Sequence, residues 1–176
     1  PEIEAFDPGM IANAAYYLKK GVLKAPLHFQ FCMGCANGIP GSVKNLVFMK
    51  ETMDQLCPGS TWSTFGVGHS AMETMYAAVA LGGHIRVGME DNVMYSKGVL
   101  ADSNAQFVER AARVIREYGN EVATSAEARE MLGLAPLDHE AVVKALDALT
   151  IEDLEKAKAE ASEKYGTTYF AAKSMG

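Results

Sequence analysis

The segment 82–92 carries the residues whose types and spacing are best suited to chemistry. Arg86 precedes two adjacent acids, Glu90 and Asp91, at the end of what reads as a short strand. Because side chains alternate between the faces of a strand, Arg86 and Glu90 should share one face while Asp91 points to the other. A strand that ends in carboxylates at its C-terminal edge is typical of an enzyme site.

The alternative is a surface strand whose charged end is only solvated, which is the commoner situation for an arbitrary strand. Two features before this strand favour a site instead. The apolar run Ala77–Leu81 and the pair Gly82 and Gly83 indicate close packing of the segment that leads into it.

Two further motifs allow more than one interpretation. Cys32 and Cys35 form a lone C-x-x-C pair, which could be a redox motif or half of a zinc site. Because no second pair exists, buried or loop cysteines are favoured. The glycine-rich stretch 34–41 could cradle a phosphate or a pantetheine group, but it lacks the lysine of a phosphate-binding loop, and a plain connecting loop explains it equally well.

Composition limits the class of protein. The chain has 176 residues, of which 49% are hydrophobic, with a net charge of −6 and a pI near 5.2, so it lacks the basic footprint of a nucleic-acid-binding protein. No apolar run reaches the length of about 18 residues that a membrane helix needs. Three cysteines do not form a disulfide framework, which favours a reducing, cytoplasmic location.

Strand and helix patterns alternate along the chain and predict an α/β fold with a parallel sheet. The strands are expected at 2–7, 27–33, 62–67 and 86–90, and the helices at 10–20, 42–56, 70–81, 103–118 and 125–132, with one or two more in 137–166.

Polar residues on the second face of the strands distinguish this sheet from a doubly wound one, in which both faces are apolar. His28, Gln30, Glu2 and Glu4 would suit the interior of a barrel. Four βα units are half of a TIM (β/α)₈ barrel, which takes about 250 residues. Since the chain also opens directly on a strand, we expect the N-terminal half of the barrel as a missing segment or a separate chain.

Several segments together resemble the beta-keto acid cleavage enzyme family, from Pro1 to about Leu134, with 82–92 as the most specific part. They are Pro1–Asp7, Pro26–Phe31, Trp62–Gly68, Gly82–Asn92 and Ala123–Glu130. The resemblance implies strands five to eight of a zinc-dependent barrel (residues 1–134). Residues 135–176 extend beyond the resemblance and are expected to form a helical C-terminal extension and tail. The resemblance also implies a reaction in which a β-keto acid and acetyl-CoA give acetoacetate and a new CoA thioester, and a homo-oligomer, as a tetramer.

The resemblance assigns roles to individual residues. Glu90 corresponds to a zinc ligand, Asp91 to the general base and Arg86 to the arginine that works with it, lowering the pKa of Asp91 and orienting it. Either Glu2 or Glu4 corresponds to a further essential carboxylate, and the sequence leaves this choice open.

The two histidine ligands of the family's zinc have no counterpart here. They form a His-x-His pair on strand two, whereas the four histidines of this chain stand apart, so they are expected from the missing N-terminal half. Two alternatives remain: another metal-dependent aldolase or lyase acting on a keto acid, and a non-catalytic barrel fragment or assembly subunit.

Overall fold

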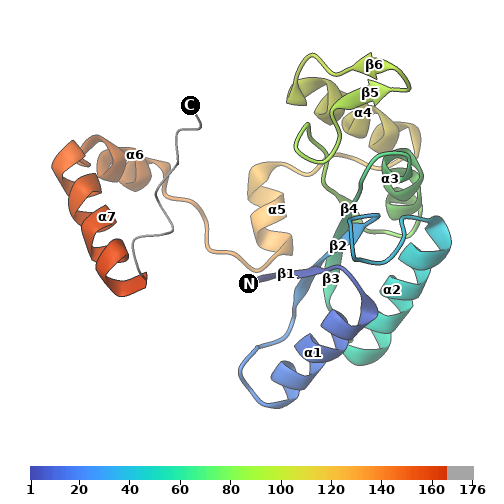
Figure 1. Cartoon of the computed structure of the whole chain (residues 1–176), viewed down its shortest axis with the longest axis horizontal. Helices are drawn as coiled ribbons and strands as arrows, with labels where there is room; N and C mark the ends of the chain where they lie inside the picture. The colour runs from blue at the N-terminus through green and yellow to red at the C-terminus, as the bar shows by residue number, and fades with distance from the viewer. Residues whose placement is uncertain (166–176) are drawn as a thin grey trace. The chain divides into compact units, whose positions relative to one another are not determined.

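The computed structural model describes residues 1–165 (Figure 1). They divide into two compact units, the first spanning Pro1–Gly133 and the second beginning at Leu134. The elements of the first unit are β1 (Glu2–Ala5), α1 (Pro8–Lys19), β2 (His28–Met33), α2 (Val43–Leu56), β3 (Thr61–Gly66), α3 (Ser70–Ala80), β4 (His84–Ile85), β5 (Met94–Ser96), β6 (Val99–Leu100), α4 (Asn104–Glu117) and α5 (Ser125–Met131). The second unit contains α6 (His139–Asp147) and α7 (Ile151–Tyr165).

The main sheet has four parallel strands in the order β1-β2-β3-β4. Each strand follows its neighbour through a helix, as the alternating pattern predicted, so the α/β class is confirmed. The strands are short, and β4 has only two residues.

One face of this sheet packs against helices and forms the core. Phe29, Phe31 and Trp62 lie on this face, and the Phe31 and Trp62 rings stack with their centroids 5.4 Å apart. Because their side chains repeat every second residue, the register places them together. Helices α1 and α2 cover them with Ile11, Leu46, Met49 and Met53.

The opposite face is polar, as the sequence predicted. Register aligns Glu4 with Gln30 and Gln30 with Ser63, and the Gln30 amide donates to the Ser63 hydroxyl at 3.1 Å. Two residues earlier on the same strands, His28 Nδ1 lies 2.8 Å from the Thr61 hydroxyl. Every buried polar side chain of the described residues has a hydrogen-bond partner.

A close approach at the end of β3 fixes where α3 begins. A Cβ atom on Gly66 would lie 2.7 Å from the Ser70 carbonyl oxygen and 2.5 Å from the Thr74 hydroxyl. Only glycine fits here without displacing backbone. The first turn of α3 therefore sits directly beside the C-terminal edge of the sheet.

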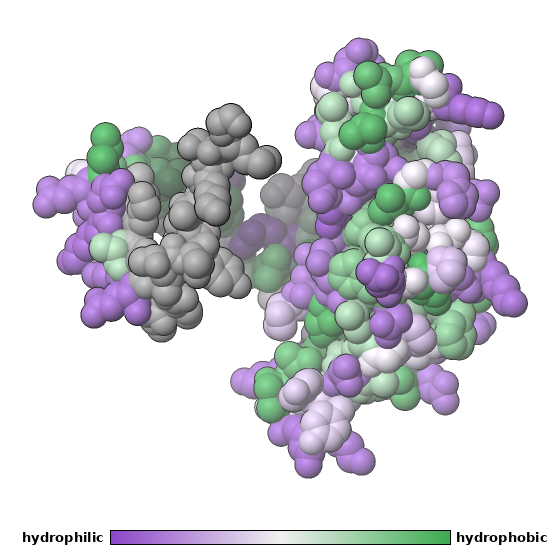
Figure 2. Space-filling model, in the orientation of Figure 1, coloured by the Kyte–Doolittle hydropathy of each residue, from purple (hydrophilic) through white to green (hydrophobic). Residues whose placement is uncertain are grey.

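The β5–β6 hairpin was not predicted, since the sequence indicated only a loop around Lys97. Val93, Met94, Val99 and Leu100 are exposed there. At the top of the larger unit, hydrophobic residues lie among hydrophilic ones (Figure 2).

Helices α6 and α7 confirm the predicted helical character of 137–166 as far as residue 165; residue 166 lies outside the described residues. The Thr150 hydroxyl caps α7 by accepting from the Asp153 amide at 3.1 Å. Throughout residues 1–165, no helix combines the length and apolar character needed to cross a bilayer.

Candidate functional site

Arg86 is the centre of a charged cluster at the C-terminal end of the sheet. Its amide continues the ladder beyond β4 by donating to the Thr64 carbonyl at 3.0 Å, so the backbone position is fixed. Its guanidinium lies over the Phe65 ring, 4.3 Å from the centroid. This cation–π contact holds the positively charged guanidinium over the polar face of the sheet.

Arg86 and Asp91 form a two-point ion pair. Nε donates to Asp91 Oδ2 at 3.1 Å and Nη2 to Oδ1 at 2.8 Å. The Asp91 side chain is only 5% exposed, whereas that of Glu90 is 83% exposed and meets the same Nη2 at 2.9 Å. Since bidentate pairs fix geometry in two directions, Asp91 is held rigidly.

Of the two candidate acids on β1, Glu4 is the one that reaches the cluster. Its Oε1 lies 3.3 Å from Arg86 Nη1, which also donates to Gln30 Oε1 at 2.8 Å. Glu2 lies instead near His28, with 3.9 Å between Glu2 Oε1 and His28 Nε2.

The predicted strand 86–90 was wrong in its bounds. Strand β4 ends at Ile85, and the chain then turns, with the Asn92 amide donating to the Gly88 carbonyl at 3.1 Å. The turn abolishes strand alternation, so Glu90 and Asp91 both contact Arg86 instead of pointing to opposite faces.

Two asparagines that the sequence reasoning missed hold this turn. The Asn92 side chain donates to the Gly66 carbonyl at 2.8 Å and accepts from the Gly68 amide at 2.6 Å. On the other side, Asn104 accepts from the Met89 amide at 2.8 Å. Their positions, one directly after the acids and one at the start of a helix, were the available signal.

The pKa of Asp91 is raised, contrary to the expectation that Arg86 would lower it. Burial raises this pKa most and the neighbouring Glu90 raises it further, and together they outweigh the effect of Arg86. The arginine therefore orients Asp91 more than it acidifies it.

The three cysteines show no activation, because burial raises the pKa of each thiol. All three are free, Cys32 is fully buried, and burial raises the pKa of its thiol to about 12. A thiol of this kind stays protonated and is a poor nucleophile or metal ligand. The buried-cysteine interpretation of Cys32 is confirmed.

The described residues do not form a metal centre by themselves. Within residues 1–165, no three His, Cys, Asp or Glu side chains come together in a way that could hold an ion. Glu90 offers one carboxylate, which pairs with Arg86. A structural or catalytic zinc needs at least three protein ligands.

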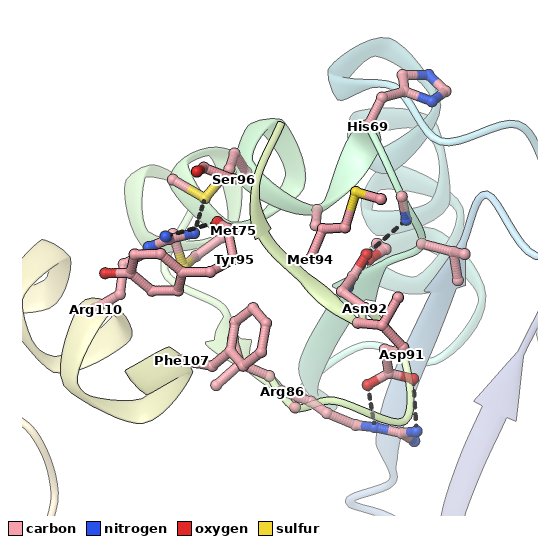
Figure 3. Close-up of a pocket in the computed structure, with 18 of the residues that line it drawn as sticks. His69, Met75, Arg86, Asp91, Asn92, Met94, Tyr95, Ser96, Phe107 and Arg110 are labelled. Carbon is pink, nitrogen blue, oxygen red and sulfur yellow. Dashed lines mark hydrogen bonds and ion pairs between the residues drawn. The ribbon is translucent and has the colours of Figure 1, made fainter. Parts of the chain in front are cut away.

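A cavity of about 780 Å³ opens beside Asp91 (Figure 3). Residues from the β3–α3 loop, helix α3, the β5 hairpin and α4 line it, and Arg86 and Asp91 form part of its wall. A buried carboxylate held by an arginine at the edge of a cavity can accept a proton from a bound molecule.

The chain matches known proteins over the unit that carries this site. A family model for beta-keto acid cleavage enzymes matches residues 1–134. The 3-keto-5-aminohexanoate cleavage enzyme of Fusobacterium nucleatum is 46% identical over 134 residues, which are 76% of this chain and 47% of the relative. The 3-oxoadipate:acetyl-CoA acetyltransferase of Cupriavidus necator is 42% identical over 138 residues, 78% of this chain and 49% of the relative.

A 3-keto-5-aminohexanoate cleavage enzyme from Acetoanaerobium sticklandii is 41% identical over 135 residues, 77% of this chain and 48% of the relative. The chain thus spans about half the length of the curated relatives it matches. The family model covers the segment that holds Arg86 and Asp91, and this protein belongs to the beta-keto acid cleavage enzyme family.

Proposed function

We propose that this chain forms part of an enzyme that exchanges acyl groups between a β-keto acid and acetyl-CoA, giving acetoacetate and a new CoA thioester. The buried Asp91 clamped by Arg86 beside a cavity is the observation that carries the proposal. Family membership supports it, and the Cupriavidus relative is named for transfer to or from acetyl-CoA.

Asp91 is the general base in this scheme. It accepts a proton from the carbon between the keto and carboxylate groups, and the resulting carbanion attacks the acetyl carbonyl and releases CoA as thiolate. The thiolate attacks the original keto carbon, the carbon–carbon bond breaks, and protonated Asp91 returns its proton to the departing acetoacetate carbanion. Arg86 keeps the carboxylate in place through both transfers, and Glu4 and Gln30 hold Arg86.

The complete enzyme would be a zinc-dependent (β/α)₈ barrel in which β1–β4 are strands five to eight. Glu90 would supply one zinc ligand, and the other ligands would come from residues outside this sequence, since the described residues lack them. Zinc, when bound, would withdraw electrons from the keto oxygen and acidify the adjacent carbon. A cytoplasmic tetramer is the proposed assembly.

The nature of the keto acid's tail is left open by the relatives. One relative is named for an amino-substituted acid and another for a dicarboxylic one, although each matches about three quarters of this chain, 76% and 78% of it. A panel of 3-oxo acids that differ in tail charge would identify the preferred substrate.

The test compares Asp91→Asn with Asp54→Asn in the complete protein, assayed for acetoacetate formation from acetyl-CoA. Asp54 is a surface residue paired with Lys50 and does not line the cavity, so its variant removes the same charge outside it. We expect Asp91→Asn to reduce turnover by about 10²–10⁴-fold, the usual contribution of a general base, with zinc content near normal. Retained turnover would remove Asp91 from this role.

Zinc analysis separates the metal proposal from the base proposal. Glu90→Gln should lower the zinc content of the complete protein, whereas Asp91→Asn should not. A protein that turns over without zinc would leave a metal-independent lyase as the better description. A complete assembly without turnover on any 3-oxo acid would favour a non-catalytic subunit.

A further inference from the structure

The Arg86 guanidinium is held on its flat side by a ring, but the ring does not set its orientation within its own plane. Phe65 lies beneath it, with 4.3 Å between the guanidinium carbon and the ring centroid. This attraction has no directional acceptor, so it leaves the guanidinium free to turn in its plane. The acceptors around its rim therefore decide where the edge that holds Asp91 points.

The register of the sheet places three polar side chains in one row across the polar face. Glu4 on β1 pairs with Gln30 on β2, and Gln30 pairs with Ser63 on β3. The Glu4 side chain is 51% exposed, whereas Gln30 and Ser63 are both 6% exposed. Water weakens the exposed contact. Gln30 is thus the firmer acceptor for Arg86 Nη1, and its contact is also the shorter one, 2.8 Å against 3.3 Å for Glu4.

Gln30 can accept from Arg86 in only one orientation of its amide. A guanidinium is a donor only, so the Gln30 oxygen must face Arg86 and the amide nitrogen must point elsewhere. That nitrogen is buried and needs an acceptor, which the Ser63 hydroxyl supplies at 3.1 Å. Without this hydroxyl a buried N–H group would lose its partner, and the amide would be stabilised by turning away from Arg86.

We propose that Ser63 is a positioning residue for the reaction. Through Gln30 it sets the orientation of Arg86, and through Arg86 it sets the place of Asp91. This relay has three hydrogen bonds, from Gln30 to Ser63 at 3.1 Å, from Arg86 to Gln30 at 2.8 Å and from Arg86 to Asp91 at 2.8 Å. The inference rests on the proposed function and adds a residue that acts on the base from the third strand of the sheet.

The test compares Ser63→Ala, Ser63→Thr and Thr61→Val in the complete protein, assayed for acetoacetate formation from acetyl-CoA. Thr61→Val is the matched control, because Thr61 lies two residues earlier on β3 and its hydroxyl shares a hydrogen bond with His28 at 2.8 Å. We expect Ser63→Ala to lower kcat about tenfold, with the KM of both substrates within about twofold of the wild type. Ser63→Thr, which keeps the hydroxyl, and Thr61→Val should each retain at least about half of the wild-type kcat.

A double variant shows whether Ser63 acts through Gln30. Gln30→Met removes both polar groups of the amide at similar side-chain length, so the Ser63 hydroxyl no longer has a group to hold. We expect Ser63→Ala to lower kcat by less than about twofold when it is added to Gln30→Met. Losses that multiply in the double variant would overturn the relay. A raised KM for the keto acid with unchanged kcat in Ser63→Ala would also overturn it, since this would indicate direct contact with the substrate.

A crystal structure of the complete Ser63→Ala protein supplies a readout that needs no turnover. We expect Arg86 Nη1 and Gln30 Oε1 to separate beyond hydrogen-bond distance in this variant and to stay in contact in Ser63→Thr. An unchanged Arg86 in Ser63→Ala would overturn the positioning role while the proposed function stands. A wild-type protein that forms no acetoacetate would overturn the proposed function, whereas displacement of Arg86 in Ser63→Ala would still support the relay.

Discussion

Glu4 and Arg86 are 82 positions apart in the chain, yet their side chains meet at 3.3 Å across the sheet. The first and fourth strands do not pair with each other, so the long arginine side chain spans β2 and β3 to make this contact. Through it, the position of Asp91 depends on the strand at the start of the chain.

Because of this contact, Glu2 and Glu4 should differ in their importance for catalysis, a choice that the sequence left open. Glu2 and Glu4 have side-chain exposures of 53% and 51%, which makes their glutamine variants a matched pair. Because Glu4 holds Arg86, we expect Glu4→Gln to lower kcat/KM about tenfold, after allowance for solvent screening, and Glu2→Gln by less than about twofold. Steady-state kinetics of the two variants checks this; equal losses would contradict it.

The turn that carries Asp91 depends on Asn92, whose side chain ties it to the β3–α3 loop by two hydrogen bonds. Asn92→Ala removes both and lets the carboxylate shift, and a shift of about 1 Å can cost about 100-fold in rate. We expect kcat to fall by about this factor with KM nearly constant. Asn120→Ala, at an exposed position beyond α4, is the control. A rise in KM with normal kcat would show that Asn92 acts on binding instead.

The sequence predicted helices and strands well where a periodic hydrophobic pattern extended over several residues. The alternation of Phe29, Phe31 and Met33 identified β2 and its buried face. The helix predicted at 125–132 begins at Ser125 as expected, and the structure adds a capping box at Thr124 and Glu127.

The site was harder to predict, because local pattern carries no information on contacts between distant residues. The resemblance paired Arg86 with Asp91, whereas the strand pattern placed them on opposite faces, and the strand assigned to them ends at Ile85. Asn92, Asn104 and the choice of Glu4 over Glu2 required the register of the strands and the path of the loops. The pKa of Asp91 required its burial, which a sequence does not state.

The core predicts a contrast between two phenylalanines. Phe31 is fully buried against Trp62, whereas Phe48 on α2 is 50% exposed. Phe31→Ala should lower the free energy of unfolding by about 3–5 kcal/mol, because it removes buried surface and leaves a cavity. Phe48→Ala should cost less than about 1 kcal/mol. Urea denaturation followed by the fluorescence of Trp62, the single tryptophan, measures both. Similar costs would show that this face of the sheet is not the core.

His28 predicts how the stability of the first unit depends on pH. Burial lowers the pKa of His28, and the nearby His84 on β4 lowers it further. Glu2 on β1 acts in the opposite direction, but its effect is smaller than that of burial, so the pKa stays below its usual value. The His28 ring also shares a hydrogen bond with the hydroxyl of Thr61 on β3.

The folded state therefore binds fewer protons at this site than the unfolded chain, whose histidine titrates near pH 6.5. The stabilising effect is complete above about pH 6.5 and is lost as the pH falls through the lower pKa of the folded state. We expect the free energy of unfolding, followed by Trp62 fluorescence, to fall between about pH 7 and 5, and to fall less in His28→Gln. His139→Gln, exposed on α6 in the second unit, should keep the wild-type dependence. A pH dependence that is unchanged in His28→Gln would mean that another group titrates on unfolding.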